Sequence, residues 1–286
     1  MKTLRIIKFS VLTLLTGAML FSCSKDEDLT QQSDFILDQS TNFTVRPDFA
    51  TVDNRPQEVI AQFKVTDKDA IAVELDRTKT AGKYAVVVGI SDYDGTANDL
   101  QYCDEDASDW KARLQTEGYT VTSLVDRNAT KAAIESALQN LASLSVAGNE
   151  IAFVYSGHGS RGNIISTDLY YINEAWFGTT FSNATSTKMM FSFDACQIGE
   201  MATALNAAGR IIAVGSAKNT YSYDGDATMQ NGVFTYYQME GFDDLNYIYF
   251  EPDCQYACDQ MTIWAKSVHV RVKPSYVDSY AGDFDL

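Results

Sequence analysis

Proline, glycine and histidine are scarce in this sequence. Only 4 prolines and 17 glycines occur among 286 residues, which is too few for a fibrous chain or one rich in linkers. No internal repeat and no low-complexity tract is present. Hydrophobic residues make up 45% of the chain and aromatic residues 12%. The sequence therefore predicts one sizeable globular domain with a large buried core, plus appendages.

Positive charge is also in short supply. The 22 lysines and arginines are outnumbered by 38 aspartates and glutamates, so the formal net charge is −16 at pH 7. This excess disfavours binding to nucleic acid and to anionic membrane surfaces. It is compatible with a cationic substrate, although most of the carboxylates are expected to be solvated surface. We therefore expect no nucleic-acid partner.

The first residues have the pattern of a secretory signal. Lys2, Arg5 and Lys8 precede an apolar run over residues 11–21, which is too short and wrongly flanked for a membrane-spanning helix. Residues 20–23 (LFSC) resemble a bacterial lipobox, which implies cleavage before Cys23 and lipid attachment to its thiol. An ordinary signal peptide is the alternative. The resemblance predicts a signal at residues 1–22 and a mature protein that contacts the membrane only through its lipid anchor.

The segment that follows Cys23 is polar. Residues 24–28 (SKDED) resemble the export tag of surface lipoproteins in some Gram-negative bacteria, with a solvated tether as the alternative. We expect residues 23–82 to be a flexible leader, in which 59–65 and 70–75 are candidate strands that pack on the core or belong to a pro-segment. The predicted location is the cell envelope, lipid-anchored at the outer membrane, with surface exposure left open.

From residue 83 to residue 286, apolar runs alternate with amphipathic segments. We expect strands at 84–90, 119–124, 150–155, 188–193 and 210–214, helices at 104–117, 130–144, 199–208, 233–241 and 253–266, and a hairpin or short strand in 164–172. This alternation predicts a layered α/β fold with a mainly parallel central sheet and helices on both faces.

Cysteine is used sparingly, and no pair of cysteines has metal-ligand spacing. Besides Cys23, the chain has Cys103, Cys196, Cys254 and Cys258. The absence of a repeated CxxC pattern leads us to predict no metal site and no cofactor. Cys254 and Cys258 lie four residues apart in a predicted helix, where we expect two packed thiols rather than a disulfide.

Two strand ends carry the residues that point to chemistry. His158 lies between glycines just after the strand at 150–155, and Cys196 follows the strand at 188–193. Active sites of such sheets lie beyond the carboxyl ends of the strands, and a thiol beside an imidazole suits nucleophilic catalysis. A helix expected to start near Cys196 would favour its thiolate. His269 is the only other histidine, and we expect it to be a strand or surface residue.

These strand ends resemble the motifs of a known family. Residues 154–159 (VYSGHG) and 193–196 (FDAC) are similar to the paired motifs of caspase-like peptidases, including metacaspases and legumain-like relatives. Similarity continues in residues 100–107, 231–237 and 281–284. The resemblance implies a cysteine endopeptidase acting on a peptide or protein substrate. It assigns general acid–base catalysis to His158 and nucleophilic attack to Cys196, with the N–H groups of Gly159 and Cys196 as the oxyanion hole.

The resemblance also bears on specificity. Asp106 and Asp194 match positions that, in metacaspases, line an acidic pocket for Arg or Lys, and Ser216 matches a position in the pocket wall. The alternative is that both carboxylates cap local structure. Asp194 stands where animal caspases have Gln, and Ile198 where they have Gly. The acidic calcium loop of many metacaspases has no match between residues 160 and 188.

Two other functions remain open at this level. The chain could be a catalytically silent caspase-like surface lipoprotein used for binding, or a legumain-like peptidase or transpeptidase with a different specificity. The sequence makes no prediction about the oligomeric state.

Overall fold

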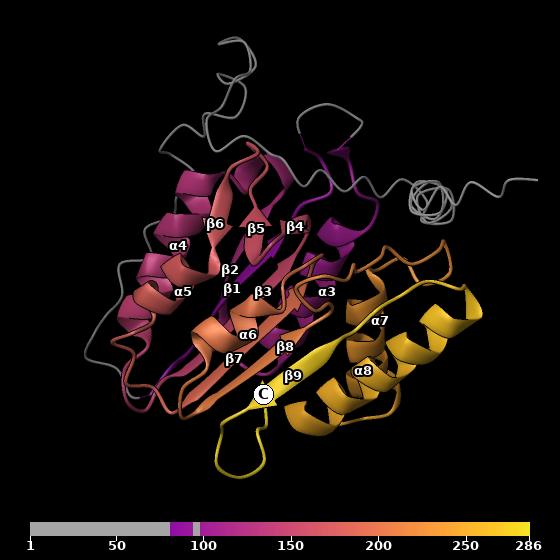
Figure 1. Cartoon of the computed structure of the whole chain (residues 1–286). Helices are drawn as coiled ribbons and strands as arrows, with labels where there is room; N and C mark the ends of the chain where they lie inside the picture. The colour runs from indigo at the N-terminus through magenta and orange to yellow at the C-terminus, as the bar shows by residue number, and fades with distance from the viewer. Residues whose placement is uncertain (1–80, 94–97) are drawn as a thin grey trace, which may run out of the picture.

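A six-stranded sheet forms the centre of the molecule. The computed structural model describes residues 81–93 and 98–286, and its strand order is β2-β1-β3-β7-β8-β9 (Figure 1). All neighbouring strands run parallel except β9, which pairs antiparallel with β8 at one edge. The strands are β1 (Lys83–Gly89), β2 (Thr120–Val125), β3 (Glu150–Ser156), β7 (Lys188–Asp194), β8 (Arg210–Val214) and β9 (Ser275–Asp278).

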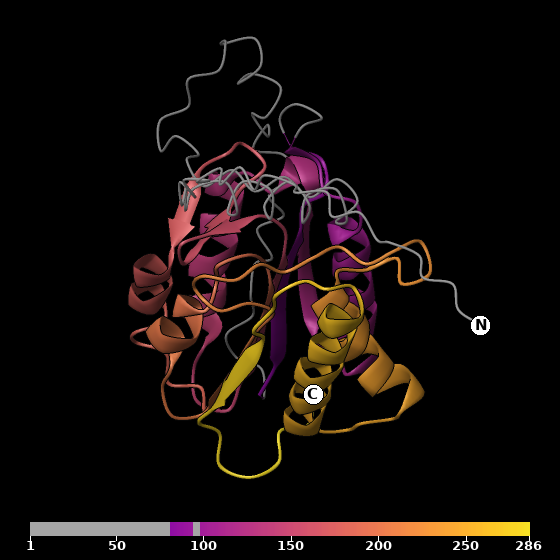
Figure 2. The same cartoon turned by 45° about the vertical axis from the view of Figure 1, so that its right-hand side comes forward.

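Helices cover both faces of this sheet, as Figures 1 and 2 show. Side chains from α4, α5 and α6 pack on one face, and side chains from α3, α7 and α8 pack on the other. The helices are α3 (Cys103–Thr116), α4 (Lys131–Leu144), α5 (Glu174–Thr180), α6 (Glu200–Leu205), α7 (Val233–Met239) and α8 (Phe250–Ser267). The predicted fold class, a mainly parallel sheet between helical layers, is confirmed.

The alternation of side chains along the strands divides the core into two clusters. In β1, Val86 and Val88 face the α4 side, while Ala85 and Val87 face the α3 side. Because a parallel strand between two helical layers is buried on both faces, it reads as an unbroken apolar run in the sequence. This is why the strand at 84–90 could be predicted from its composition alone.

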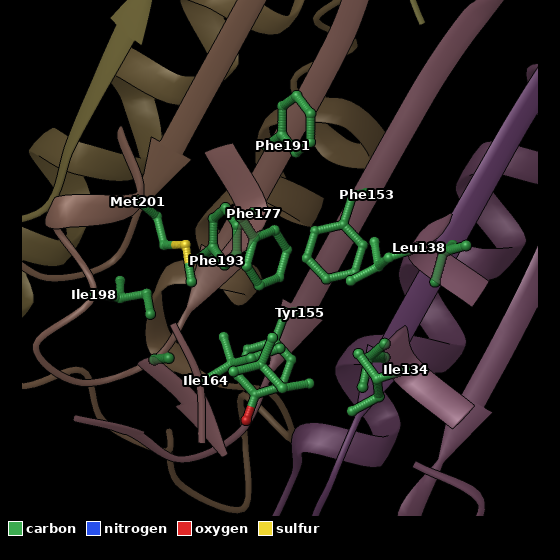
Figure 3. Close-up of a cluster of buried hydrophobic side chains, with 14 of the residues drawn as sticks. Ile134, Leu138, Phe153, Tyr155, Ile164, Phe177, Phe191, Phe193, Ile198 and Met201 are labelled. Carbon is green, nitrogen blue, oxygen red and sulfur yellow. The ribbon is translucent and has the colours of Figure 1, made fainter. Parts of the chain in front are cut away.

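Aromatic rings fill the first of these clusters. Phe153 of β3 packs 5.5 Å, centroid to centroid, from both Phe177 and Phe193. Figure 3 shows these rings together, with Tyr155 and Ile164 beside them. Buried aromatic pairs at such separations stabilise a core beyond the area that they bury. This packing holds the carboxyl ends of β3 and β7 in fixed positions.

Several elements differ from the expectation. The helix expected at 199–208 is only α6, and the helix at 233–241 ends in a π-helix, η3 (Glu240–Asp244). The region expected to hold a hairpin is a small sheet of β4 (Gly159–Ser160), β5 (Asn163–Ile165) and β6 (Tyr171–Asn173). Residues 268–272 form no strand, and His269 is an exposed surface residue.

Residues 23–80 of the predicted leader, which include Cys23 and the candidate strands at 59–65 and 70–75, lie outside the described residues. Among the helices that are described, none combines the length and the apolar character needed to cross a membrane. Cys254 and Cys258 are both free and buried in α8, as predicted.

Candidate active site

His158 and Cys196 follow neighbouring strands that pair in register. Ser156, the last residue of β3, lies opposite Asp194, the last residue of β7. The Gly157 N–H donates to the Asp194 carbonyl at 3.2 Å. A methyl group added to Gly159 would lie 2.3 Å from the Cys196 carbonyl oxygen, so only glycine allows this approach. The two turns therefore lie against each other at the carboxyl edge of the sheet.

The imidazole of His158 is held by a backbone carbonyl. Its Nε2 lies 2.7 Å from the carbonyl oxygen of Asn98, and the residue is 2% exposed. Because a carbonyl oxygen can only accept, Nε2 must carry the proton. In the neutral ring Nδ1 is then the nitrogen that can accept a proton. The sequence offered no candidate for this orienting group, since a backbone carbonyl leaves no side-chain signature.

The thiol of Cys196 is enclosed by the segment that follows β8. Its Sγ lies 3.3 Å from both the carbonyl oxygen and the backbone nitrogen of Ser222. Burial raises the pKa of the Cys196 thiol well above its ordinary value; the Ser222 N–H lowers this pKa, and the Asp194 and Asp224 carboxylates raise it. The expectation of a thiolate at a helix start was wrong. Helix α6 begins only at Glu200, so Cys196 does not lie at the start of that helix.

A small cavity adjoins the thiol. The space open to the centre of a water molecule is about 10 Å³, room for roughly one water. Its lining comes from α3 and the loop before it, from the ends of β3 and β7, and from the segment between β8 and α7: Leu100, Cys103, Ser156, Gly157, Asp194, Ala195, Cys196, Ser222, Tyr223, Asp224 and Gly232.

The structure brings Asp106 and Asp194 together around Gly232. A methyl group at Gly232 would lie 2.4 Å from Asp194 Oδ2 and 2.8 Å from Asp106 Oδ2. Asp194 lines the cavity, while Asp106 lies behind it, accepting hydrogen bonds from Ser156 Oγ (2.5 Å) and the Gly232 N–H (2.9 Å). Asp194 accepts from Ser222 Oγ and from the Thr235 N–H at 3.0 Å. Both carboxylates thus organise the segment over the cavity.

Burial governs the protonation of these carboxyls. It raises the pKa of Asp106 well above its ordinary value, and the nearby Asp194 raises it further. Burial also raises the pKa of Asp194, against the lowering effect of its hydrogen bonds from Ser222 and Thr235. Two carboxyl groups this close repel each other when both are ionised. The pair therefore retains a proton to higher pH than an isolated aspartate does.

A third carboxyl, Asp224, was not predicted. It is 8% exposed, lines the cavity, and accepts from the Gln101 N–H at 2.9 Å. Burial raises its pKa to about 7. Asp224 lies outside the quoted motifs, in a segment with no regular periodicity, so only the fold places it beside Cys196.

Ser216 lies behind the nucleophile rather than in the lining of this cavity. Its Oγ donates to the Ala195 carbonyl at 2.7 Å and accepts from the Ile198 N–H at 3.3 Å. It therefore braces the backbone on both sides of Cys196. Within residues 81–93 and 98–286, no group of three or more histidine, cysteine, aspartate or glutamate side chains is arranged to hold a metal ion.

Residues 82–246 match the model of the caspase domain, peptidase C14. The chain belongs to the caspase family. The match covers more than half of the chain and includes both catalytic candidates, His158 and Cys196. No sequence among curated proteins matches this caspase-family chain.

Solved structures share the fold of this caspase domain. Caspase-1 from Spodoptera frugiperda aligns with a TM-score of 0.56 and 13% identity, over 73% of this chain and 94% of that one. A protein of Geobacter sulfurreducens aligns with a TM-score of 0.55 and 17% identity, over 72% of this chain and 97% of that one. At these identities the likeness is one of fold.

Proposed function

We propose that this caspase-family chain is a cysteine endopeptidase in which Cys196 is the nucleophile and His158 is the general acid–base. The observation that carries the proposal is the juxtaposition of the two turns, with Gly159 packed on the Cys196 backbone and His158 Nε2 bonded to Asn98 O. A fixed Nε2–H tautomer leaves Nδ1 to take the thiol proton.

The raised pKa of Cys196 favours a neutral thiol in the resting site. The thiol proton would therefore pass to His158 as sulfur attacks the substrate carbonyl. The N–H groups of Gly159 and Cys196 would stabilise the oxyanion. The imidazolium would then give its proton to the leaving amine, and water would hydrolyse the thioester with His158 as base.

We propose that the residue before the cleaved bond is Arg or Lys. Asp194 and Asp224 line the cavity beside the nucleophile, with Asp106 behind them. Charge-assisted hydrogen bonds from a guanidinium or ammonium group would compensate these buried carboxylates. Because the cavity has room for roughly one water, the segment around Ser222 must withdraw before such a side chain enters.

Catalytic efficiency toward Arg peptides is expected to rise with pH through about 7, because the pKa of Asp224 is raised to about 7. Below that pH the carboxyl is neutral and binds a cation weakly; above it the carboxylate binds the cation well. Asp224→Asn should flatten this rise when kcat/KM is measured on both sides of pH 7. An unchanged pH profile in Asp224→Asn would assign the titration to another group.

Self-cleavage at basic residues follows from the same specificity. Arg161 is exposed in the turn between β4 and β5 and is open to attack. Lys83, by contrast, is the first residue of β1 and donates to the Leu286 carbonyl at 3.0 Å, so cleavage there would require the sheet to open.

The buried thiol favours one alternative, a catalytically silent domain used for binding. Cys196 is 1% exposed and hydrogen-bonded to Ser222. A peptide ending in Arg with a thiol-reactive group decides between the two functions. Saturable labelling that Cys196→Ala abolishes supports the peptidase, whereas a thiol that reacts only after unfolding supports the silent domain.

We also propose that the mature chain begins at a lipid-modified Cys23 in the outer membrane. Cys23→Ser should shift the protein from the membrane fraction to the aqueous fraction, because two or more acyl chains provide the stable attachment. Mass spectrometry of the wild type should find residues 1–22 missing and acyl groups on Cys23. An unmodified N-terminus in aqueous protein would reject the anchor.

A further inference from the structure

His158 lies in a short turn rather than within a long strand or helix. It falls between Ser156, the end of β3, and the two-residue strand β4. A general base must be held within a fraction of an ångström of its productive position, and displacement by about 1 Å can cost about a hundredfold in rate. Something other than regular secondary structure must therefore hold this turn.

Two buried tyrosine hydroxyls bond the peptide groups of His158 from both sides. The His158 N–H donates to Tyr93 Oη at 2.8 Å. Tyr155 Oη donates to the His158 carbonyl at 2.7 Å. Both tyrosines are essentially enclosed, at 2% and 0% exposure. The backbone on each side of the imidazole is thus fixed by a buried side chain, that of Tyr93 after β1 and that of Tyr155 near the end of β3.

The same hydroxyls tie the turn to the neighbouring strand β5. Tyr155 Oη lies 2.9 Å and Tyr93 Oη 3.3 Å from the Ile165 carbonyl oxygen, and the two hydroxyls lie 3.4 Å apart. Burial raises the pKa of both phenols, so they remain neutral donors in the working pH range. The ring of Tyr93 also packs against the imidazole, with centroids 4.6 Å apart.

Gly157 leaves the space that these two hydroxyls occupy. A methyl group there would lie 2.6 Å from Tyr93 Oη and 2.7 Å from Tyr155 Oη. Any other residue would push the hydroxyls away from His158. The glycine before the histidine is therefore needed for the approach of the two phenols, in addition to any freedom it gives the turn.

We propose that Tyr93 and Tyr155 are positioning residues that fix the backbone and ring of His158, an inference that rests on the proposed peptidase function. Removing the Tyr93 hydroxyl takes away the acceptor of the buried His158 N–H, and removing the Tyr155 hydroxyl leaves the His158 carbonyl with the Ile165 N–H, at 3.1 Å, in place of two donors. The turn then samples several positions, and the imidazole loses its alignment with Cys196 and with the Asn98 carbonyl. Substrate binding is untouched, because neither tyrosine lines the cavity beside the nucleophile.

Tyr93→Phe and Tyr155→Phe are expected to lower kcat by about 10- to 100-fold and to leave KM within about twofold. The double variant should fall little below the worse single variant, because the hydroxyls act on one turn and share Ile165. Tyr119→Phe is the matched control: this tyrosine is 4% exposed, and its hydroxyl has no hydrogen-bond partner within the described residues. Its kcat should equal that of the wild type.

Histidine NMR supplies a readout that does not depend on activity. The chain has only 2 histidines, so ring signals of His158 and His269 can be told apart with a His269→Gln variant. In both tyrosine variants the His158 ring signals should shift or broaden and their titration midpoint should move, while those of exposed His269 stay in place. The two variants remove different hydrogen bonds, so if one fails to fold the other decides.

Wild-type kcat together with an unchanged His158 spectrum in the tyrosine variants would overturn the proposal. Loss of kcat with unchanged His158 signals would also overturn it, by showing that the hydroxyls act elsewhere. If the wild type cleaves no peptide, the peptidase function fails. The NMR comparison with Tyr119→Phe still shows in that case whether the phenols hold the histidine.

Discussion

Replacing Cys196 with alanine is expected to lower kcat/KM for peptide hydrolysis by roughly a thousandfold or more. The Cys196 turn packs on the His158 turn at the carboxyl edge of β7, and a serine hydroxyl or a water molecule is a weaker nucleophile than this thiol. The measurement is cleavage of fluorogenic peptides ending in Arg or Lys. The folded state is checked by unfolding in denaturant.

Two other cysteines serve as controls. Cys258 lies on α8, away from the cavity, and Cys258→Ala should keep wild-type activity. Cys103 lines the cavity but is not at a strand end, so Cys103→Ala should keep substantial activity with an altered KM. Full activity in Cys196→Ala would show that this residue is not the nucleophile.

Replacing Asp194 with asparagine is expected to cost about 2–5 kcal/mol in transition-state binding of Arg peptides, about 30-fold to several thousandfold in kcat/KM. The asparagine keeps the shape: its amide oxygen can accept from the Thr235 N–H and its amide N–H can donate to Ser222 Oγ, but it carries no charge to meet a guanidinium. Alkylation of Cys196 by a small uncharged reagent should change little.

Asp109→Asn is the matched control for this charge removal. Asp109 is exposed on α3 and accepts from Asn231 Nδ2 at 2.9 Å, the same group that donates to Asp106 at 3.0 Å. It lies outside the cavity lining, so its replacement should leave Arg cleavage unchanged.

A wild-type preference for peptides ending in Asp or Asn would contradict the acidic pocket. Asp106 and Asp194 would then serve only to hold the segment over the cavity, and the legumain-like alternative would be favoured.

Much of the fold could be predicted because its signals are local. The run at 84–90 and the periodic helix at 130–144 follow from side-chain patterns within single elements, and β1 and α4 confirm them. Strand β9 has only four residues, all of them half-buried or exposed, so it lacks such a pattern. Its pairing with β8 depends on the C-terminal chain returning to the sheet edge.

The π-helix η3 also depends on contacts from outside its own segment. A methyl group at Gly241 would lie 2.2 Å from Asp253 Oδ1 of α8, so this glycine allows the close packing of η3 on α8. No local sequence pattern in residues 240–244 predicts this close packing against α8. The helix predicted at 233–241 therefore begins at the predicted residue, but the prediction missed the π-helix at its end.

The sequence by itself determined the family, the α/β layering and the two residues proposed for catalysis, because glycine-flanked His158 and strand-ending Cys196 are unusual in their own surroundings. Only the tertiary structure decided how they are arranged. The carbonyl that orients His158 comes from Asn98, 60 residues earlier, and the hydroxyl that holds its N–H comes from Tyr93, 65 residues earlier. The buried state of the Cys196 thiol and the third carboxyl at Asp224 likewise arise from the segment after β8. Local periodicity reports on neighbours along the chain, whereas hydrogen bonds and desolvation depend on which distant groups the packed sheet brings within a few ångströms.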